Sequence, residues 1–224
     1  GSDNRRMFSA SLAGNLGDSP DGWVGSLYAR LYSDDGQRYQ VLDTSSKLPI
    51  TTTDPRATID LDSSLIHGDT KIRASFHRNR AQEFYVIENT QNDFNRTQHE
   101  LQQISLEQGL SLVDGVNTQF YTGYLVGTQD LHILLASAAL VGPLSNPRVN
   151  EPLLGIGKIR GENISLGLTN DWAIDKNANA LWGIEWKREE DVYSNTYNNY
   201  DLLQFLARKY PVTYYGNFEH AVPL

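Results

Sequence analysis

The chain has 224 residues and a net charge of −8, from 19 Lys and Arg against 27 Asp and Glu. It contains no Cys, which excludes disulfides, thiolate metal sites and cysteine nucleophiles. The acidic balance opposes charge-driven binding of nucleic acid, and no stretch approaches the roughly 18 apolar residues of a membrane-spanning helix. We therefore expect one domain over residues 3–224, after a tag remnant at Gly1-Ser2, with no nucleic-acid partner and no insertion into a membrane.

Alternation of apolar and polar residues predicts β-strands along the N-terminal half. The clearest case is residues 23–32, where Leu27, Ala29 and Leu31 share one face. Asp34-Asp35-Gly36 follows, and Gly36 can supply the positive φ of a hairpin loop, so we expect a strand, a turn and a second strand here. The same pattern predicts strands at residues 7–12, 57–62, 71–77 and 83–87.

The C-terminal half continues the β pattern with more apolar residues. Residues 120–141 are evenly apolar, most of all residues 131–141, which favours strands covered on both faces. Residues 153–188 are typical of a three-strand meander with turns at 160–163 and 175–179. Residues 142–147 are the best candidate for a domain boundary, but the segments on either side are alike.

Two helices are expected to interrupt the strands. Thr97 and Glu100 have capping-box spacing, and Leu101 and Ile104 follow at helical spacing, although this Gln-rich stretch also suits a strand. Residues 202–209 carry an apolar stripe, and Pro211 would end that helix. The predicted fold is therefore all-β and mainly antiparallel, a β-sandwich or small β-barrel with one or two short helices.

No motif predicts catalysis or a cofactor. Gly17-Asp18-Ser19 resembles a hydrolase nucleophile block only in composition, and the glycines from Gly155 to Gly161 miss the spacing of a nucleotide fingerprint. Asp60 and Asp62 share a strand face and could form a Ca²⁺ or carboxylate pair, although a solvated polar face explains them more simply. The five His residues form no ligand pattern, so we expect no catalytic residue, metal or cofactor.

A segment rich in Tyr, Asn and Ser suggests a binding surface instead. Tyr offers rigid contact area with a polar tip, and Asn and Ser adapt their hydrogen bonds, a mixture found at recognition surfaces. The alternative is a loop whose rings pack on the sheet. The expected ligand-binding residues are Tyr193, Asn195, Tyr197, Asn198, Tyr200, Tyr214 and Tyr215.

These observations favour a non-enzymatic recognition domain outside a cell or on a virion. It would be a spike, capsid protrusion or adhesin head that binds a host receptor protein or a glycan, and we expect it to be a homo-oligomer. The glycosylation sequons at Asn95 and Asn163 are compatible with that location.

Two other classes stay open. An outer-membrane β-barrel fits the acidic charge, the lack of Cys, the aromatic content and the alternating strands. Three features oppose it: the expected helix at 202–209, residues 221–224 without a terminal aromatic, and strands whose outward faces carry charge, as at Asp60 and Asp62. A carbohydrate-active enzyme with Glu185 as general acid would need sugar-stacking rings around that carboxylate. Alternation instead puts Glu185 on the face opposite Trp182 and Trp186.

Overall fold

The computed structural model describes residues 4–17, 22–42, 47–82, 94–136, 153–198 and 217–220. The predicted all-β, antiparallel fold class is confirmed, and no helix occurs among these residues. Helices that are long and apolar enough to cross a membrane are likewise not found in the described part of the chain.

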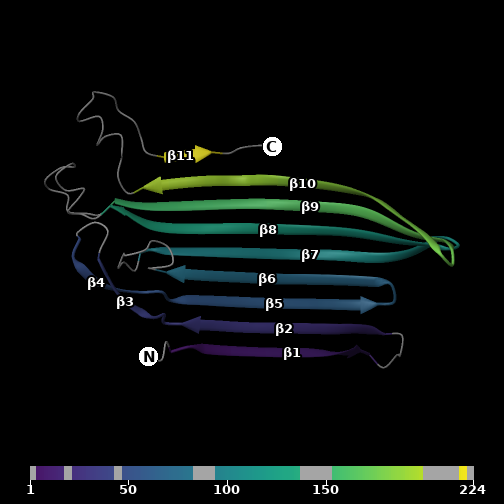
Figure 1. Ribbon diagram of the computed structural model, residues 1–224, viewed down its shortest axis with the longest axis horizontal. Helices are drawn as coiled ribbons and strands as arrows, with labels where there is room; N and C mark the ends of the chain where they lie inside the picture. Colours follow the sequence, from purple (N-terminus) through teal and green to yellow (C-terminus); the bar gives the residue numbers. More distant parts are fainter. Residues whose placement is uncertain are drawn as a thin grey trace.

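One large sheet dominates the structure, and its strands follow one another in chain order apart from a short excursion after β2 (Figure 1). Every neighbouring pair is antiparallel. The strands of this sheet are, in spatial order, β1 (Arg6–Leu16), β2 (Trp23–Asp34), β5 (Arg56–His67), β6 (Thr70–Gln82), β7 (Arg96–Val113), β8 (Val116–Ala136), β9 (Leu153–Asp175), β10 (Ala178–Asn198) and β11 (Asn217–His220).

The two faces of this sheet differ in chemistry. Residues that are directly opposite in antiparallel strands share a face, so the register assigns each side chain to one of them. One face is lined mostly by large hydrophobic side chains, and we call it the apolar face. It carries Phe8, Leu12, Leu27, Leu31, Ile59, Leu61, Phe76, Ile104, Leu106, Phe120, Val126, Ile164, Leu166, Leu168, Trp182, Ile184 and Trp186. The polar face carries their chain neighbours, mostly Ser, Gly, Asn, Gln and charged residues.

The predicted hairpin after β2 is wrong in its pairing. Gly36 does have the expected positive φ, +74°, but β2 pairs with β1 and β5. The strand after the turn, β3 (Arg38–Leu42), pairs with β4 (Pro49–Thr53) in a separate two-stranded sheet. Buried Asp34 anchors this excursion, since it accepts hydrogen bonds from the Gly36 N–H at 3.0 Å and from Arg56 Nε at 3.0 Å.

The helix expected near residues 97–109 is also wrong, because these residues lie in β7. Leu101 and Ile104 are three residues apart, which mimics helical spacing, but in the strand they point to opposite faces. The turn expected at 160–163 is also absent, because β9 runs unbroken from Leu153 to Asp175. The residues at 160–163 have the composition of a turn, but in β9 their side chains alternate between the two faces. The turn near 175–179 is confirmed, since β9 ends at Asp175 and β10 begins at Ala178.

Other expectations fall partly or wholly outside the described residues. These are the strand at 83–87, the boundary at 142–147, the helix at 202–209 and most of the Gly17–Gly22 turn. Of the apolar run at 131–141, the residues from Leu131 to Leu134 are half-buried rather than buried. The described part of the chain forms a single layer here (Figure 1), so no described strand covers a second face of these residues.

Candidate functional site

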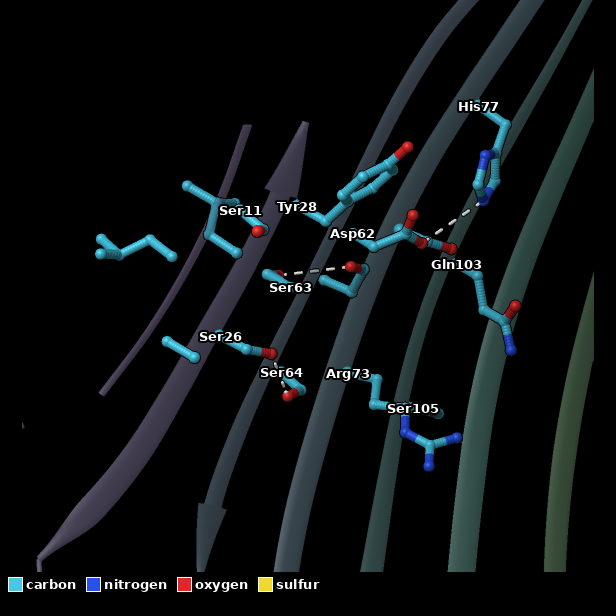
Figure 2. Close-up of a pocket in the computed structure, with 15 residues that line it drawn as sticks. Ser11, Ser26, Tyr28, Asp62, Ser63, Ser64, Arg73, His77, Gln103 and Ser105 are labelled. Atoms are coloured by element: carbon cyan, nitrogen blue, oxygen red, sulfur yellow. Dashed lines mark hydrogen bonds and ion pairs between the residues drawn. The ribbon is translucent and has the colours of Figure 1, made fainter. Parts of the chain in front are cut away.

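A shallow polar depression lies over β1, β2, β5, β6 and β7. Its volume is about 510 Å³. Figure 2 shows its lining, in which hydroxyl, carboxylate, imidazole, guanidinium and amide groups converge from these strands. The polar side chains that this face contributes to the lining are Ser11, Ser26, Tyr28, Asp62, Ser64, Arg73, Ser75, His77, Gln103 and Ser105.

His77 lies between the two carboxylates that the sequence placed on one strand face. Its Nδ1 is 3.1 Å from Asp60 Oδ1, and its Nε2 is 3.5 Å from Asp62 Oδ1. Asp60 also approaches Arg30, with 3.5 Å between Oδ2 and Nε. Asp60 and Asp62 therefore do share a face, as expected, and they belong to a charged cross-strand network.

This network consists of partly exposed charged side chains that pair across neighbouring strands. A serine nucleophile needs a histidine nitrogen as its base, and both nitrogens of His77 face carboxylates. No hydroxyl hydrogen-bonds to His77 within the described residues. Nor does any group of three or more His, Cys, Asp or Glu in this part of the chain have the placement to hold a metal ion.

Glu185 lies further along the polar face, opposite Gly167 on β9, so the alternation argument about it is confirmed. The Tyr121 ring from β8 covers Gly167, where an added Cβ would overlap the ring atoms. Burial, followed by the hydrogen bond to Glu185 and its negative charge, raises the pKa of Tyr121 above its usual value. Trp182 and Trp186 occupy the opposite face, so neither ring flanks the Glu185 carboxylate.

The apolar face exposes large hydrophobic side chains on strands from one end of the sheet to the other. Ile184 is 72% exposed and Trp182 is 58% exposed. Others that are exposed on this face are Phe8, Leu12, Leu16, Leu27, Leu31, Leu61, Leu65, Ile104, Ile164, Leu166, Trp172 and Trp186. Apolar patches on soluble monomers seldom exceed a few hundred Å², so the extent of this exposed apolar surface needs a physical explanation.

Charged residues replace the hydrophobic ones where the strands continue beyond this patch. We call this region the charged belt: Arg78 and Arg80 on β6, Glu100 on β7, Asp130 on β8, Lys158, Arg160 and Glu162 on β9, and Arg188 and Glu190 on β10. Arg160 lies 2.7 Å from Glu162, whose pKa is lowered by a hydrogen bond from Tyr124 and, against the effect of burial, by Arg160. The charged stretch that suggested a turn in the sequence is thus the belt segment of β9.

The structure describes only some of the expected ligand-binding residues. Tyr193 and Asn195 are half-buried and lie opposite Arg160 and Lys158, at the end of the charged belt. Tyr197 and Asn198 continue β10, so residues 193–198 form a strand and not the loop of the alternative interpretation. Tyr200, Tyr214 and Tyr215 lie outside the described residues. Their role in binding stays a prediction.

Reasoning from the sequence missed the apolar face as a functional feature. The signal was available, because all four Trp of the chain occupy this face and each belongs to an alternating strand. Comparisons with protein-family models, with curated proteins and with solved structures give no match to this chain. The two faces and their chemistry therefore carry the functional argument.

Proposed function

We propose that this sheet is the wall of a membrane-embedded protein of the outer-membrane β-barrel type. In this proposal the apolar face contacts lipid acyl chains, and the polar face borders an aqueous interior. The proposal takes up one of the two alternatives left open by the sequence, and it departs from the expectation that the chain does not enter a membrane.

The observation that carries the proposal is the line along which the apolar face meets the charged belt. On β5 the apolar side chains extend as far as Ile59, whereas on β10 they end at Trp186. The register row of Ile59 crosses β9 at Arg160, while the row of Trp186 crosses β9 at Leu166, six residues further on. The boundary is therefore oblique to the strands.

The obliquity of this boundary has the size expected for tilted strands in a bilayer. Six residues span about 20 Å along a strand, and the five strand spacings from β5 to β10 span about 24 Å across the sheet, so the boundary makes an angle of about 40° with the register rows. If the boundary lies in the membrane plane, the strands tilt by about 40° from the membrane normal. Membrane barrels have strand tilts of about 35–45°.

The length of the apolar segments supports the same placement. On β2 they run from Trp23 to Leu31 and on β9 from Ile164 to Trp172, nine residues in each case. A tilted strand crosses the apolar layer in about 9–11 residues. The remainder of β9 carries the charged belt and would lie beyond that layer.

The carboxylates that opposed a membrane location in the sequence lie on the other face. Asp60 and Asp62 belong to the polar face with His77 and Arg30, so they would contact water and not lipid. The hydroxyl and glycine content of this face is typical of a hydrated barrel interior. In this arrangement, recognition of a receptor or glycan would take place at the strand ends near Tyr193, at the end of the charged belt.

The test measures whether lipid acyl chains contact the four tryptophans. The full chain is refolded into phosphatidylcholine vesicles whose acyl chains carry bromine, which quenches Trp fluorescence on contact. Because Trp23, Trp172, Trp182 and Trp186 all lie on the apolar face, we expect brominated lipid to quench most of the emission. Iodide dissolved in the aqueous phase should quench little of it.

A variant with one polar-face tryptophan is the matched control. It carries Phe at the four native Trp positions together with Tyr28→Trp, and we expect iodide to quench it and brominated lipid to leave it unaffected. A chain that stays in solution without vesicles, with its native tryptophans open to iodide, would reject the membrane proposal. That outcome would instead favour the surface-exposed recognition domain expected from the sequence.

A further inference from the structure

The β6 end of the charged belt, together with Arg6 on β1 in the register row of Arg80, carries an excess of positive charge. Elsewhere on the belt the bases have acidic neighbours: Arg160 has Glu162, Lys158 has Asp130 at 3.9 Å, and Arg188 has Glu190. On β1 and β6 the balance differs. Arg78 approaches Glu100 at 3.9 Å, whereas no ion-pair partner of Arg6 or Arg80 is found among the described residues.

Arg6 and Arg80 lie on one register row with only small side chains between them. The row reads Arg6, Ser33, Ala57, Arg80. Three strand spacings separate the two arginine backbones by roughly 14 Å. Because Ser33 and Ala57 are short, the two long guanidinium side chains can reach toward each other above them, with space for one anionic group.

The floor next to this gap is apolar. The neighbouring row toward the membrane layer contains Phe8, Leu31 and Ile59. Both rows line a shallow depression of about 520 Å³. The site therefore offers cationic groups on one side and a hydrocarbon surface on the other.

The Arg80 guanidinium is poorly satisfied within the chain. Its Nε is buried and has no hydrogen-bond partner among the described atoms. Because no ion pair of Arg80 is found among the described residues, its outer guanidinium nitrogens can donate to the acceptor oxygens of a ligand. Guanidinium groups bind phosphate oxygens in bidentate geometry, so a phosphate matches both the charge and the hydrogen-bonding need of this site.

We propose that Arg6 and Arg80 bind the headgroup phosphate of an anionic membrane lipid, whose acyl chain lies on Phe8, Leu31 and Ile59. This inference rests on the proposed membrane location, because the boundary of the apolar layer is where lipid phosphates lie. The shared cationic and apolar character of the depression favours a lipid over a free anion. Arg78, one row closer to the apolar layer, adds positive charge beside the same gap.

The probe is dioleoyl phosphatidic acid, and dioleoyl phosphatidylcholine serves as the neutral reference with the same chains. Native mass spectrometry of the full chain in detergent micelles counts the lipid molecules retained at equal concentrations of the two. We expect the wild-type chain to retain phosphatidate about tenfold better, as charge-assisted hydrogen bonds to two arginines allow. The double variant Arg6→Gln with Arg80→Gln should lose this preference.

The matched control changes the same charge on the opposite face. Arg30→Gln with Arg73→Gln removes two arginines that pair with Asp60 and Glu107 on the polar face, and we expect it to keep the preference for phosphatidate. An equal loss in both double variants, or no preference in the wild-type chain, would overturn the inference. Displacement of phosphatidate by an equal concentration of inorganic phosphate would also overturn it, because the lipid chain would then contribute nothing.

Tryptophan quenching in brominated phosphatidylcholine separates the two proposals. That neutral lipid does not need the arginine site, so quenching there reports membrane location alone. Strong quenching without a phosphatidate preference would reject only the lipid site. Absence of quenching would reject both proposals.

Discussion

At the residue scale, close contact between Tyr121 and Gly167 shows how the polar face is built. The ring of Tyr121 covers the glycine on the neighbouring strand and reaches Glu185 on the strand after it. Glycine is needed here because any Cβ would occupy the space of the ring. The contact therefore links β8, β9 and β10 through side chains in addition to the backbone ladder.

We predict that Gly167→Ala destabilises the folded chain by about 1–3 kcal/mol, because the methyl group must displace the Tyr121 ring. Urea unfolding followed by Trp fluorescence measures the change. Gly127→Ala is the control, since a Cβ there would meet only Leu101 Cδ1, at an ordinary 3.8 Å. Equal stability of the two variants would show that the ring does not depend on the glycine.

At the scale of the element, neighbouring residues of one strand lie on opposite faces of the sheet and so in different environments. On β2, Leu27 lies on the apolar face, and Tyr28 lies on the polar face beside the depression. Leu27 is midway between Trp23 and Leu31, so the proposed membrane location puts it near the centre of the apolar layer. The two positions therefore separate lipid contact from simple exposure.

We predict that Leu27→Arg lowers the stability of the chain in phosphatidylcholine vesicles by about 2–4 kcal/mol, the cost of an arginine facing lipid near the bilayer midplane. Tyr28→Arg, one residue further along, should cost much less because it faces water. Unfolding by guanidinium from the vesicles measures both. Similar costs for the two variants would contradict the assignment of the faces.

At the scale of the whole molecule, the sheet edge at β1 is the feature that a membrane location constrains most. In the described part of the chain, β1 pairs only with β2, so one edge of its backbone has no strand partner. Unpaired backbone groups cost several kcal/mol each inside a bilayer, so a strand edge facing lipid must be paired. The membrane proposal therefore requires β1 to gain a further strand neighbour in lipid.

We predict that backbone amides across the whole of β1, including those directed away from β2, exchange slowly with deuterium in vesicles. Hydrogen exchange with mass spectrometry of the full chain measures this, and β5 amides provide the reference because β5 has strand neighbours on both sides. Fast exchange of the outward β1 amides beside slow exchange in β5 would leave the edge open and argue against a closed barrel.

The sequence alone determined the β class, many strand positions and the shared face of Asp60 and Asp62, because two-residue alternation is a local property of each strand. It also located the positive φ of Gly36. It failed at residues 97–109, where two apolar residues three apart suit either a helix or the two faces of a strand. It failed again at 160–163, where a charged stretch inside β9 has the composition of a turn.

Only the tertiary structure decided which strands are neighbours and what each face contains as a whole. Ile59, Arg160 and Trp186 are far apart in the chain, and only the register aligns them into an oblique boundary between apolar and charged surface. Likewise, only strand order brings Arg6 and Arg80 onto one row. The physical reason is that side-chain alternation sets which residues share a face within a strand, whereas the surface that meets water or lipid is the sum over neighbouring strands.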